Sequence, residues 1–289
     1  MTRRRIVLGL LLLAVYGYGV LSHRLRLFPT PQIEAALRRN LWLLRDERGF
    51  RDITGREPVD CAQFGEPGSA VLVTLGQSNA ANECGIGPQP GEGVYNFSLF
   101  DGKCYVARDP LLGATGDSGS VWTRLADKLV RGGVYKRVLI APMAVGGSRL
   151  SEWTPGAPHF RRIEAMQKTL AAAGVKATHI LWHQGESDAH RTSKEVYIGQ
   201  FSAMLAGMRR VGFDQPVYVA VATICRNGGS DDIRAAQNEL PRRLAGVRAG
   251  PDTDQLDRFR WRYDGCHFSA SGLEIHADLW MKALQESGR

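Results

Sequence analysis

Short apolar runs and longer stretches with helical periodicity alternate along most of the chain. The apolar runs have the length and the β-branched residues of buried strands. They occupy residues 71–75, 137–142, 178–182 and 216–224. The helical stretches occupy residues 121–130, 160–173, 193–211, 231–244 and 271–285. Strands that alternate with helices predict an α/β fold in which a parallel sheet is covered on both faces.

The region around residues 81–120 does not follow this alternation. It is rich in Gly, Asn and Asp, so we expect a long functional loop there rather than regular structure. The chain has 289 residues, a length that fits one large α/β domain with a smaller appendage. We place the large domain at residues 65–289.

An apolar run near the N-terminus has a different character. Residues 6–22 carry no charge and follow three arginines at 3–5, which is the arrangement of a signal anchor or a secretory signal peptide. The run is slightly shorter than the ~20 residues of a spanning helix, but it lacks an Ala-x-Ala cleavage site. We therefore favour a membrane anchor over residues 1–25, followed by a juxtamembrane helix and linker at 26–64.

This anchor predicts a large domain outside the cytoplasm, either periplasmic or extracellular, attached to the membrane through the N-terminal helix. If the segment is cleaved, the domain is secreted instead. A cytosolic protein with an apolar N-terminal helix is the remaining alternative.

The positive charge of the chain is concentrated at the same end. The formal net charge is +8, and most of the excess lies within residues 1–60. The rest of the chain is only weakly basic and contains no signature of a DNA- or RNA-binding module. We therefore expect no nucleic-acid partner.

The first predicted strand, residues 71–75, ends in a polar sequence that can carry chemistry. Gly76 allows a tight turn, and Gln77, Ser78 and Asn79 follow it. Ligands bind at the carboxyl ends of the strands in open α/β sheets, so Ser78 occupies the position of a nucleophile. The alternative is an ordinary turn in which Ser78 or Asn79 caps the next helix.

A second candidate lies near the C-terminus, where Asp264 stands three residues before His267. A carboxylate at this spacing can reach the histidine Nδ1, which fixes the tautomer and leaves Nε2 free to deprotonate Ser78. The candidate oxyanion donors are the N–H groups of Ser78 and Gly147 and the side-chain amide of Gln184. Each feature alone has an alternative, because Asp-x-x-His is often a surface pair and Gly-Gly is often a turn.

Together these motifs resemble those of the SGNH, or GDSL-like, hydrolases of the sialate O-acetylesterase and acetylxylan esterase type. The resemblance spans roughly residues 70–275. It rests on the stretches 76–79, 146–147 with Trp153 shortly after, 182–188 and 264–269. It implies a flavodoxin-like, three-layer α/β/α sandwich and a metal-free serine esterase that removes acetyl groups from carbohydrates.

The resemblance also implies a role for each motif residue. It assigns Ser78 as the nucleophile, His267 as the base and Asp264 as the acid. It assigns the oxyanion hole to the N–H groups of Ser78 and Gly147 and to Gln184, which stands where the wider superfamily has an Asn. We further expect the remaining motif residues to bind the substrate, namely Gln77, Asn79, Trp153 and Glu186.

The predicted substrate is an acetylated carbohydrate or polysaccharide. No cofactor or metal is expected, because no paired Cys/His spacing is present. One alternative is an acetyltransferase that uses the same triad and a glycan hydroxyl in place of water. Another is a catalytically silent carbohydrate-binding module on the same fold, which the joint presence of the three triad residues disfavours. A further alternative is a thioesterase or lipase, although a lipase would be expected to have a larger apolar lid and the loop at 81–120 is polar.

Five cysteines lie outside the N-terminal apolar run, and pairs are expected in an oxidising compartment. Cys225 ends the fourth predicted strand and Cys266 directly precedes the candidate catalytic histidine, so we expect a disulfide between them. The alternative is two buried free thiols. Cys84 and Cys104 would close the long loop, which leaves Cys61 unpaired.

Overall fold

An eight-stranded sheet forms the centre of the computed structural model, which describes residues 15, 16, 18, 49–226 and 228–286. The strands are β1 (Pro58–Val59), β2 (Ser69–Gly76), β3 (Val94–Phe97), β4 (Cys104–Val106), β5 (Arg137–Pro142), β6 (His179–His183), β7 (Val217–Val221) and β8 (Val247–Asp252). Their order across the sheet is β1-β4-β3-β5-β2-β6-β7-β8.

The strands from β3 to β8 in this order run parallel, and β1 and β4 pair antiparallel at one edge. β2 lies in the middle, between β5 and β6, and all but its first residue are buried. A strand buried on both faces needs a continuous apolar run, which the residues of β2 supply. The predicted α/β fold is confirmed, with a sheet that is mostly rather than wholly parallel.

Five helices of the described chain cover the sheet: α3 (Val121–Arg131), α4 (Phe160–Ala172), α5 (Lys194–Arg210), α6 (Asp231–Arg243) and α7 (Ala270–Glu286). Three of them begin at a serine whose side chain accepts a hydrogen bond from the first turn, namely Ser120, Ser193 and Ser230. Such caps satisfy backbone N–H groups that have no partner within the helix.

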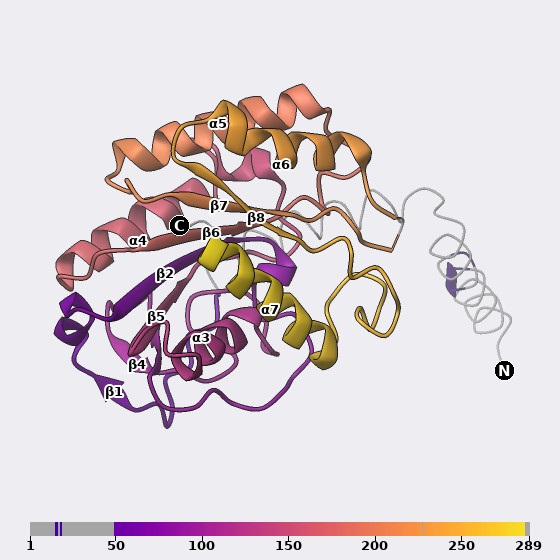
Figure 1. Cartoon of the computed structure of the whole chain (residues 1–289). Coiled ribbons are helices and arrows are strands. Elements are labelled where there is room, and N and C mark those ends of the chain that lie inside the picture. The colour runs from indigo at the N-terminus through magenta and orange to yellow at the C-terminus, as the bar shows by residue number, and fades with distance from the viewer. Residues whose placement is uncertain (1–14, 17, 19–48, 227, 287–289) are drawn as a thin grey trace, which may run out of the picture. The chain divides into compact units, whose positions relative to one another are not determined.

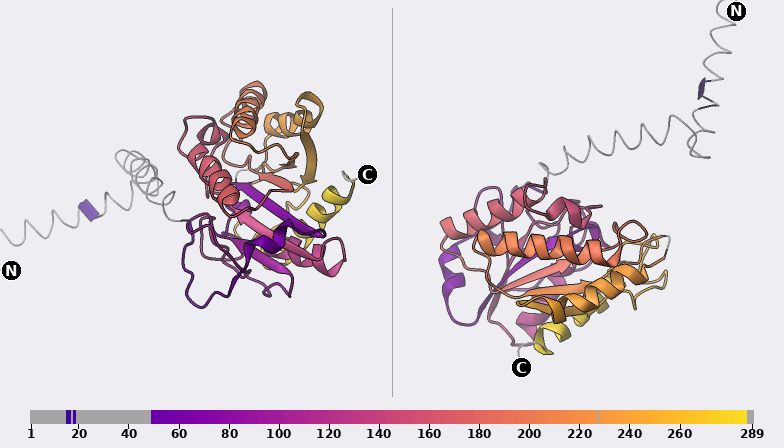
Figure 2. Two further views of the ribbon diagram at one scale, coloured as in Figure 1. Left: turned by 90° about the vertical axis from the view of Figure 1, so that its left-hand side faces the viewer. Right: turned by 90° about the horizontal axis from the view of Figure 1, so that it is seen from above.

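The helices form two layers (Figure 1). α3 and α7 cover one face, and α4, α5 and α6 cover the other, as the turned views also show (Figure 2). On the first face the rings of Trp122 and Trp280 pack with their centroids 5.4 Å apart. On the second face Trp182 of β6 packs edge-on against Phe201 of α5 at 6.1 Å. The first contact joins α3 to α7 within one layer, and the second joins α5 to the sheet.

The strands that the sequence did not predict are β1, β3, β4 and β8. β3 and β4 lie within residues 81–120, where we expected only a loop. β8 contains Arg248, Gly250 and Pro251, and such residues obscure a strand pattern. β8 forms the sheet edge beside β7, where fewer apolar residues are needed.

The N-terminal predictions lie largely outside the described residues. This holds for the anchor at 1–25, apart from residues 15, 16 and 18, and for the helix expected in the juxtamembrane segment. Within the part of the chain that the structure describes, no helix is both long enough and apolar enough to cross a membrane.

Candidate active site

The loops that carry the predicted motifs meet at the carboxyl end of β2. After β2 the chain forms β3, β4 and β5 on one side of it and then β6 on the other side. β2 therefore lies at a topological switch point, where open α/β sheets bind ligands. The N–H of Gln77 donates to the carbonyl of His183 on β6 at 3.1 Å. The hydroxyl of Ser148, after β5, donates to the carbonyl of Gly76 at 3.2 Å.

Gly76 is required for the turn that presents Ser78. Its φ is +136°, and a Cβ at this position would lie 2.0 Å from the carbonyl oxygen of His183. A side chain is therefore excluded both by backbone conformation and by space. Ser78 then starts the short 3-10 helix η2 (Ser78–Ala80), two residues after the end of β2.

The structure brings Asp264 and His267 together as predicted. Asp264 Oδ2 lies 2.9 Å from His267 Nδ1, and Oδ1 accepts the N–H groups of Cys266 and His267. Burial opposes the charge of Asp264, but hydrogen bonds from the backbone and ring of His267 and from the Cys266 N–H outweigh it. They hold the pKa of Asp264 well below its ordinary value. The carboxylate therefore stays ionised and can orient the imidazole.

Asn79 connects the Ser78 turn to the His267 loop. Its side-chain amide donates to the carbonyl of Cys266 at 3.2 Å, and its oxygen accepts the N–H of Phe268 at 3.3 Å. It therefore binds the residue before His267 and the residue after it. No hydrogen bond among the described residues joins Ser78 Oγ to His267 Nε2, and such catalytic bonds often form only with substrate in place.

Two of the residues expected to bind substrate, Asn79 and Glu186, are buried in the protein interior instead. Asn79 is fully buried, Glu186 is 8% exposed, and Asn79 Nδ2 donates to Glu186 Oε1 at 2.7 Å. Burial raises the pKa of Glu186, although the bond from Asn79 opposes this shift. The substrate-binding prediction is therefore corrected for both residues. Asn79 holds the loop that carries His267, and Glu186 holds the side chain of Asn79.

Trp153 also faces the interior. It is fully buried, and its indole N–H donates to Ser148 Oγ at 2.9 Å. Its expected contact with substrate is therefore corrected to support of the loop that follows β5.

The predicted disulfide between Cys225 and Cys266 is present, with 4.0 Å between the two Cα atoms. It ties the loop after β7 to the catalytic histidine loop. The predicted Cys84–Cys104 pair is wrong, because Cys104 bonds Cys61 and Cys84 is a buried free thiol. Cys104 starts β4, which pairs with the edge strand β1, and Cys61 lies two residues after the end of β1. Cys84 lies in the core.

Two backbone groups are available to hold an oxyanion. Among the described residues, neither the N–H of Ser78 nor that of Gly147 donates a hydrogen bond. Gly147 has a φ of +73°, a conformation that glycine adopts readily. Both groups remain candidates, as the sequence predicted.

The third expected oxyanion donor, Gln184, has no free hydrogen. It is fully buried, and its amide nitrogen carries two hydrogens. That nitrogen lies within hydrogen-bonding distance of three protein oxygens, at 2.6 Å from Asp188 Oδ2, 3.1 Å from the Ser148 carbonyl and 3.3 Å from Gln77 Oε1. Its own oxygen accepts the hydroxyl of Tyr197 at 3.1 Å. The prediction for Gln184 is corrected to a structural role.

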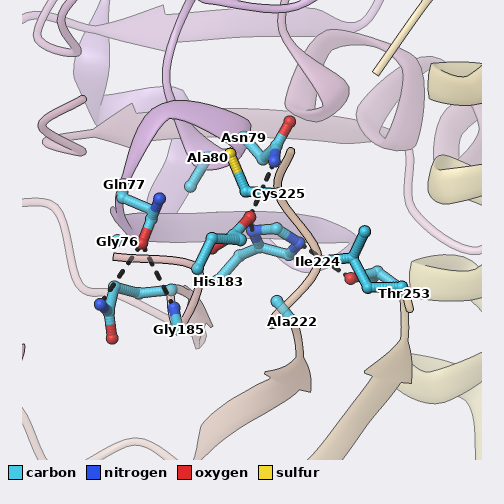
Figure 3. Close-up of polar contacts among 12 residues, drawn as sticks. Gly76, Gln77, Asn79, Ala80, His183, Gly185, Ala222, Ile224, Cys225 and Thr253 are labelled. Atoms are coloured by element: carbon cyan, nitrogen blue, oxygen red, sulfur yellow. Dashed lines mark hydrogen bonds and ion pairs between the residues drawn. The ribbon is translucent and has the colours of Figure 1, made fainter. Parts of the chain in front are cut away.

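Gln77 has the complementary arrangement. Its side-chain oxygen accepts from Gln184 Nε2, from the Gly185 N–H at 3.4 Å and from the Ser187 N–H at 3.0 Å. Its amide nitrogen donates to none of the described residues, and Figure 3 shows it pointing away from these donors. Because Gln77 directly precedes Ser78, this fixed and unused N–H₂ group is a better candidate oxyanion donor than Gln184.

Sequence reasoning missed two further residues beside His267. The carboxylate of Glu83 lies 4.0 Å from His267 Nε2. The ring of Tyr263 stacks on the His267 ring with centroids 6.0 Å apart. Neither belongs to a motif, and only their nearness to Ser78 and Asp264 in the sequence could have drawn attention to them. No group of three His, Cys, Asp or Glu side chains in the described part of the chain could hold a metal ion.

Comparison with known proteins agrees with this geometry. Residues 69–274 match the family described as carbohydrate esterase, sialic acid-specific acetylesterase. No curated protein matches the sequence.

Solved structures share the fold at low sequence identity. A protein from Arabidopsis thaliana is 21% identical, with a TM-score of 0.62, over 77% of this chain and 98% of that chain. NanS is 16% identical, with a TM-score of 0.56, over 76% and 98% of the two chains. A carbohydrate acetylesterase from Xanthomonas citri is also 16% identical, with a TM-score of 0.56, over 76% and 57%.

Proposed function

The chain belongs to the sialic acid-specific acetylesterase family of carbohydrate esterases and is a carboxylic ester hydrolase; we propose that it removes O-acetyl groups from a carbohydrate through an acyl-enzyme on Ser78. The observation that carries the proposal is the bond of 2.9 Å between Asp264 and His267, on a loop that Asn79 fastens beside Ser78. This is the arrangement that activates a serine nucleophile.

In the proposed first step Ser78 Oγ attacks the acetyl carbonyl while His267 Nε2 takes its proton. Asp264 keeps the imidazole oriented and stabilises the imidazolium that forms. The developing oxyanion accepts hydrogen bonds from the N–H groups of Ser78 and Gly147 and from the amide of Gln77. The sugar oxygen leaves with the proton from His267, and acetyl-Ser78 remains.

In the second step His267 removes a proton from water, which attacks the acetyl carbon of acetyl-Ser78. Acetate leaves and the serine hydroxyl is restored. If a glycan hydroxyl takes the place of water, the same residues transfer the acetyl group instead, so the two activities differ in the acceptor and not in the triad.

The experiment that tests this function is acetate release from a panel of O-acetylated monosaccharides and polysaccharides. Wild-type protein should release acetate, and a folded Ser78→Ala variant should lose nearly all turnover. Acetate release by Ser78→Ala at the wild-type rate would refute the mechanism. Acetyl groups that appear on an added glycan rather than as acetate would identify a transferase.

We also propose that the catalytic domain works outside the cytoplasm. The disulfides Cys61–Cys104 and Cys225–Cys266 support this, because such bonds persist in oxidising compartments. The uncharged run at 6–22 behind arginines supports attachment to the membrane. A reporter enzyme fused after residue 30 should show its activity outside the cytoplasm and not inside it. Reporter activity inside the cytoplasm would refute the placement.

A further inference from the structure

The carboxylate of Glu83 is held close to Nε2 of His267, the atom that takes up and returns the proton in the proposed reaction. Its Oε2 lies 4.0 Å from His267 Nε2. Its Oε1 accepts the hydroxyl of Thr115 at 3.0 Å, and Thr115 in turn accepts the N–H of Gly146 at 2.7 Å. A Cβ on Gly146 would lie 1.9 Å from Glu83 Oε1. Glu83 therefore lies directly over the turn that carries the candidate oxyanion donor Gly147.

The backbone of Glu83 is held as well. The hydroxyl of Tyr263 donates to the Glu83 carbonyl at 3.2 Å, and the Tyr263 ring stacks on His267 with 28° between the ring planes. Tyr263 is about half exposed, so it borders the site with an aromatic face of the kind on which a sugar ring packs. Glu83, Tyr263 and His267 together form one wall of the site.

The charge of Glu83 has no lysine or arginine partner in the part of the chain that the structure describes. Among the described residues no lysine or arginine forms an ion pair with it, and His267 is its only charged-pair neighbour. Arg226, on the loop after β7, pairs with Asp264 at 3.2 Å instead. The side chains of Glu83 and His267 are 24% and 19% exposed, so a substrate bound at His267 meets this charge.

The reaction itself brings the sugar to this carboxylate. His267 Nε2 must deliver a proton to the sugar oxygen that leaves, so that oxygen comes within hydrogen-bonding distance of Nε2. The sugar ring then lies beside Glu83. A carboxylate accepts hydrogen bonds from sugar hydroxyls and attracts an ammonium group. It repels a second carboxylate at such a distance, since like charges at a partly buried site are weakly screened.

We propose, on the basis of the esterase function above, that Glu83 is a specificity-determining residue that favours neutral or amino sugars and disfavours sugars with a carboxylate, such as O-acetylated sialic acids. The chain would thus deacetylate carbohydrates of a different charge from those for which its family is described.

The test compares kcat/KM for two soluble esters that differ in charge, an O-acetylated neutral hexose and a 9-O-acetylated sialic acid. We expect wild-type protein to prefer the neutral ester by about tenfold or more, a size typical of like-charge repulsion near a binding group. Glu83→Gln keeps the shape and removes the charge. It should raise kcat/KM for the anionic ester relative to that for the neutral ester by about tenfold.

Glu164→Gln is the matched control, because Glu164 is an exposed carboxylate of α4 away from the triad, and it should leave both values unchanged. Glu83→Ala should reproduce the gain on the anionic ester if the charge is the cause. The preference of the wild-type protein for the neutral ester over the anionic ester should also weaken as salt is added.

Three results would overturn the proposal. The first is equal use of both esters by wild-type protein, and the second is an unchanged ratio in Glu83→Gln. The third is an equal fall in kcat for both esters, which would mean that Glu83 acts on His267 and not on the substrate. Turnover of 4-nitrophenyl acetate separates these results from failure of the esterase function, since that neutral ester reports Ser78 chemistry alone.

Discussion

At the residue scale, the two glutamines near Ser78 have opposite surroundings. Gln184 donates both of its amide hydrogens to protein oxygens, and Gln77 donates neither of its own among the described residues. A donor acts on an oxyanion only if it is fixed and unused before the reaction. Gln77 meets both conditions, because the N–H groups of Gly185 and Ser187 hold its oxygen and the nitrogen is left to the substrate.

Gln77→Glu separates the hydrogen-bond acceptor of this side chain, its oxygen, from the donor, its amide nitrogen. The new carboxylate can still accept the bonds from the Gly185 and Ser187 N–H groups, but it offers no donor to the oxyanion. We expect kcat to fall by about 100- to 1,000-fold, the usual cost of one oxyanion donor, with a smaller effect on KM. Gln167→Glu on the surface of α4 is the control. Wild-type kcat in Gln77→Glu would show that Gln77 does not contact the oxyanion.

The sequence was sufficient to place the candidate residues Ser78, Asp264 and His267 at the rim of the sheet, but not to predict the side-chain partners around them. Strand ends and the Asp-x-x-His spacing determine which residues lie at the rim of the sheet. The direction of the Gln77 and Gln184 amides depends on acceptors that come from other loops, among them Ser148 and Asp188. No local pattern contains that information.

At the element scale, the catalytic loop after β8 has little regular structure and is held by specific bonds. The guanidinium of the fully buried Arg262 donates to the carbonyls of Leu256, Ile224 and Cys266, the last at 2.6 Å. Asn79 binds the same loop from the β2 side. The Cys225–Cys266 disulfide adds a covalent link next to His267.

Cys225→Ser breaks this link without changing the neighbour of His267. We expect kcat to fall by about 100-fold, because a displacement of ~1 Å at a catalytic group has that effect, while the fold persists at assay temperature. Cys61→Ser removes the other disulfide, which joins the segment after β1 to β4 near one edge of the sheet. It should lower the free energy of unfolding by about 2–5 kcal/mol and leave kcat unchanged. Equal kcat values for the two variants would contradict a positioning role for Cys225–Cys266.

Element prediction from the sequence succeeded where packing and periodicity agree. The buried run of β2 and the capped, amphipathic helices α3 and α6 carry clear local signals. β3 and β4 are short, and their strand character comes from pairing with each other and with β5. β1 and β5, which are more distant along the chain, complete this pairing, so the local sequence does not show it.

At the scale of the whole molecule, a buried group of polar residues lies beneath the site. His183 bonds Thr253 at 3.2 Å (Figure 3), and its ring packs against that of His276 with centroids 4.9 Å apart. Burial lowers the pKa of His183 to about 3 and lowers the pKa of His276 well below its ordinary value. Both rings are therefore neutral in the folded protein near neutral pH.

This burial makes the free energy of unfolding depend on pH. The unfolded histidines bind protons near pH 6.5, whereas the folded ones bind them only at much lower pH, so stability is full above ~6.5 and falls as the pH drops. Each histidine contributes up to about 1.4 kcal/mol per pH unit between ~6 and 4. The raised pKa of Glu186 has the opposite sign and reduces the net effect.

Urea denaturation at pH 7, 6 and 5 measures this dependence. His276→Gln, whose amide oxygen can still accept the Trp280 N–H, should have a clearly shallower slope than the wild type. His190→Gln, at an exposed position, should keep the wild-type slope. A slope that is the same in all three proteins would contradict the assignment to the buried histidines.

The most direct measurement is the mass of the protein caught during turnover. Protein mixed with an acetylated sugar, quenched in acid within one turnover and digested should show one added acetyl group on the peptide that contains Ser78. The Ser78→Ala variant should show no acetylated peptide and no turnover. An acetyl group on any other residue, or steady release of acetate by Ser78→Ala, would contradict the account of this chain as a serine esterase.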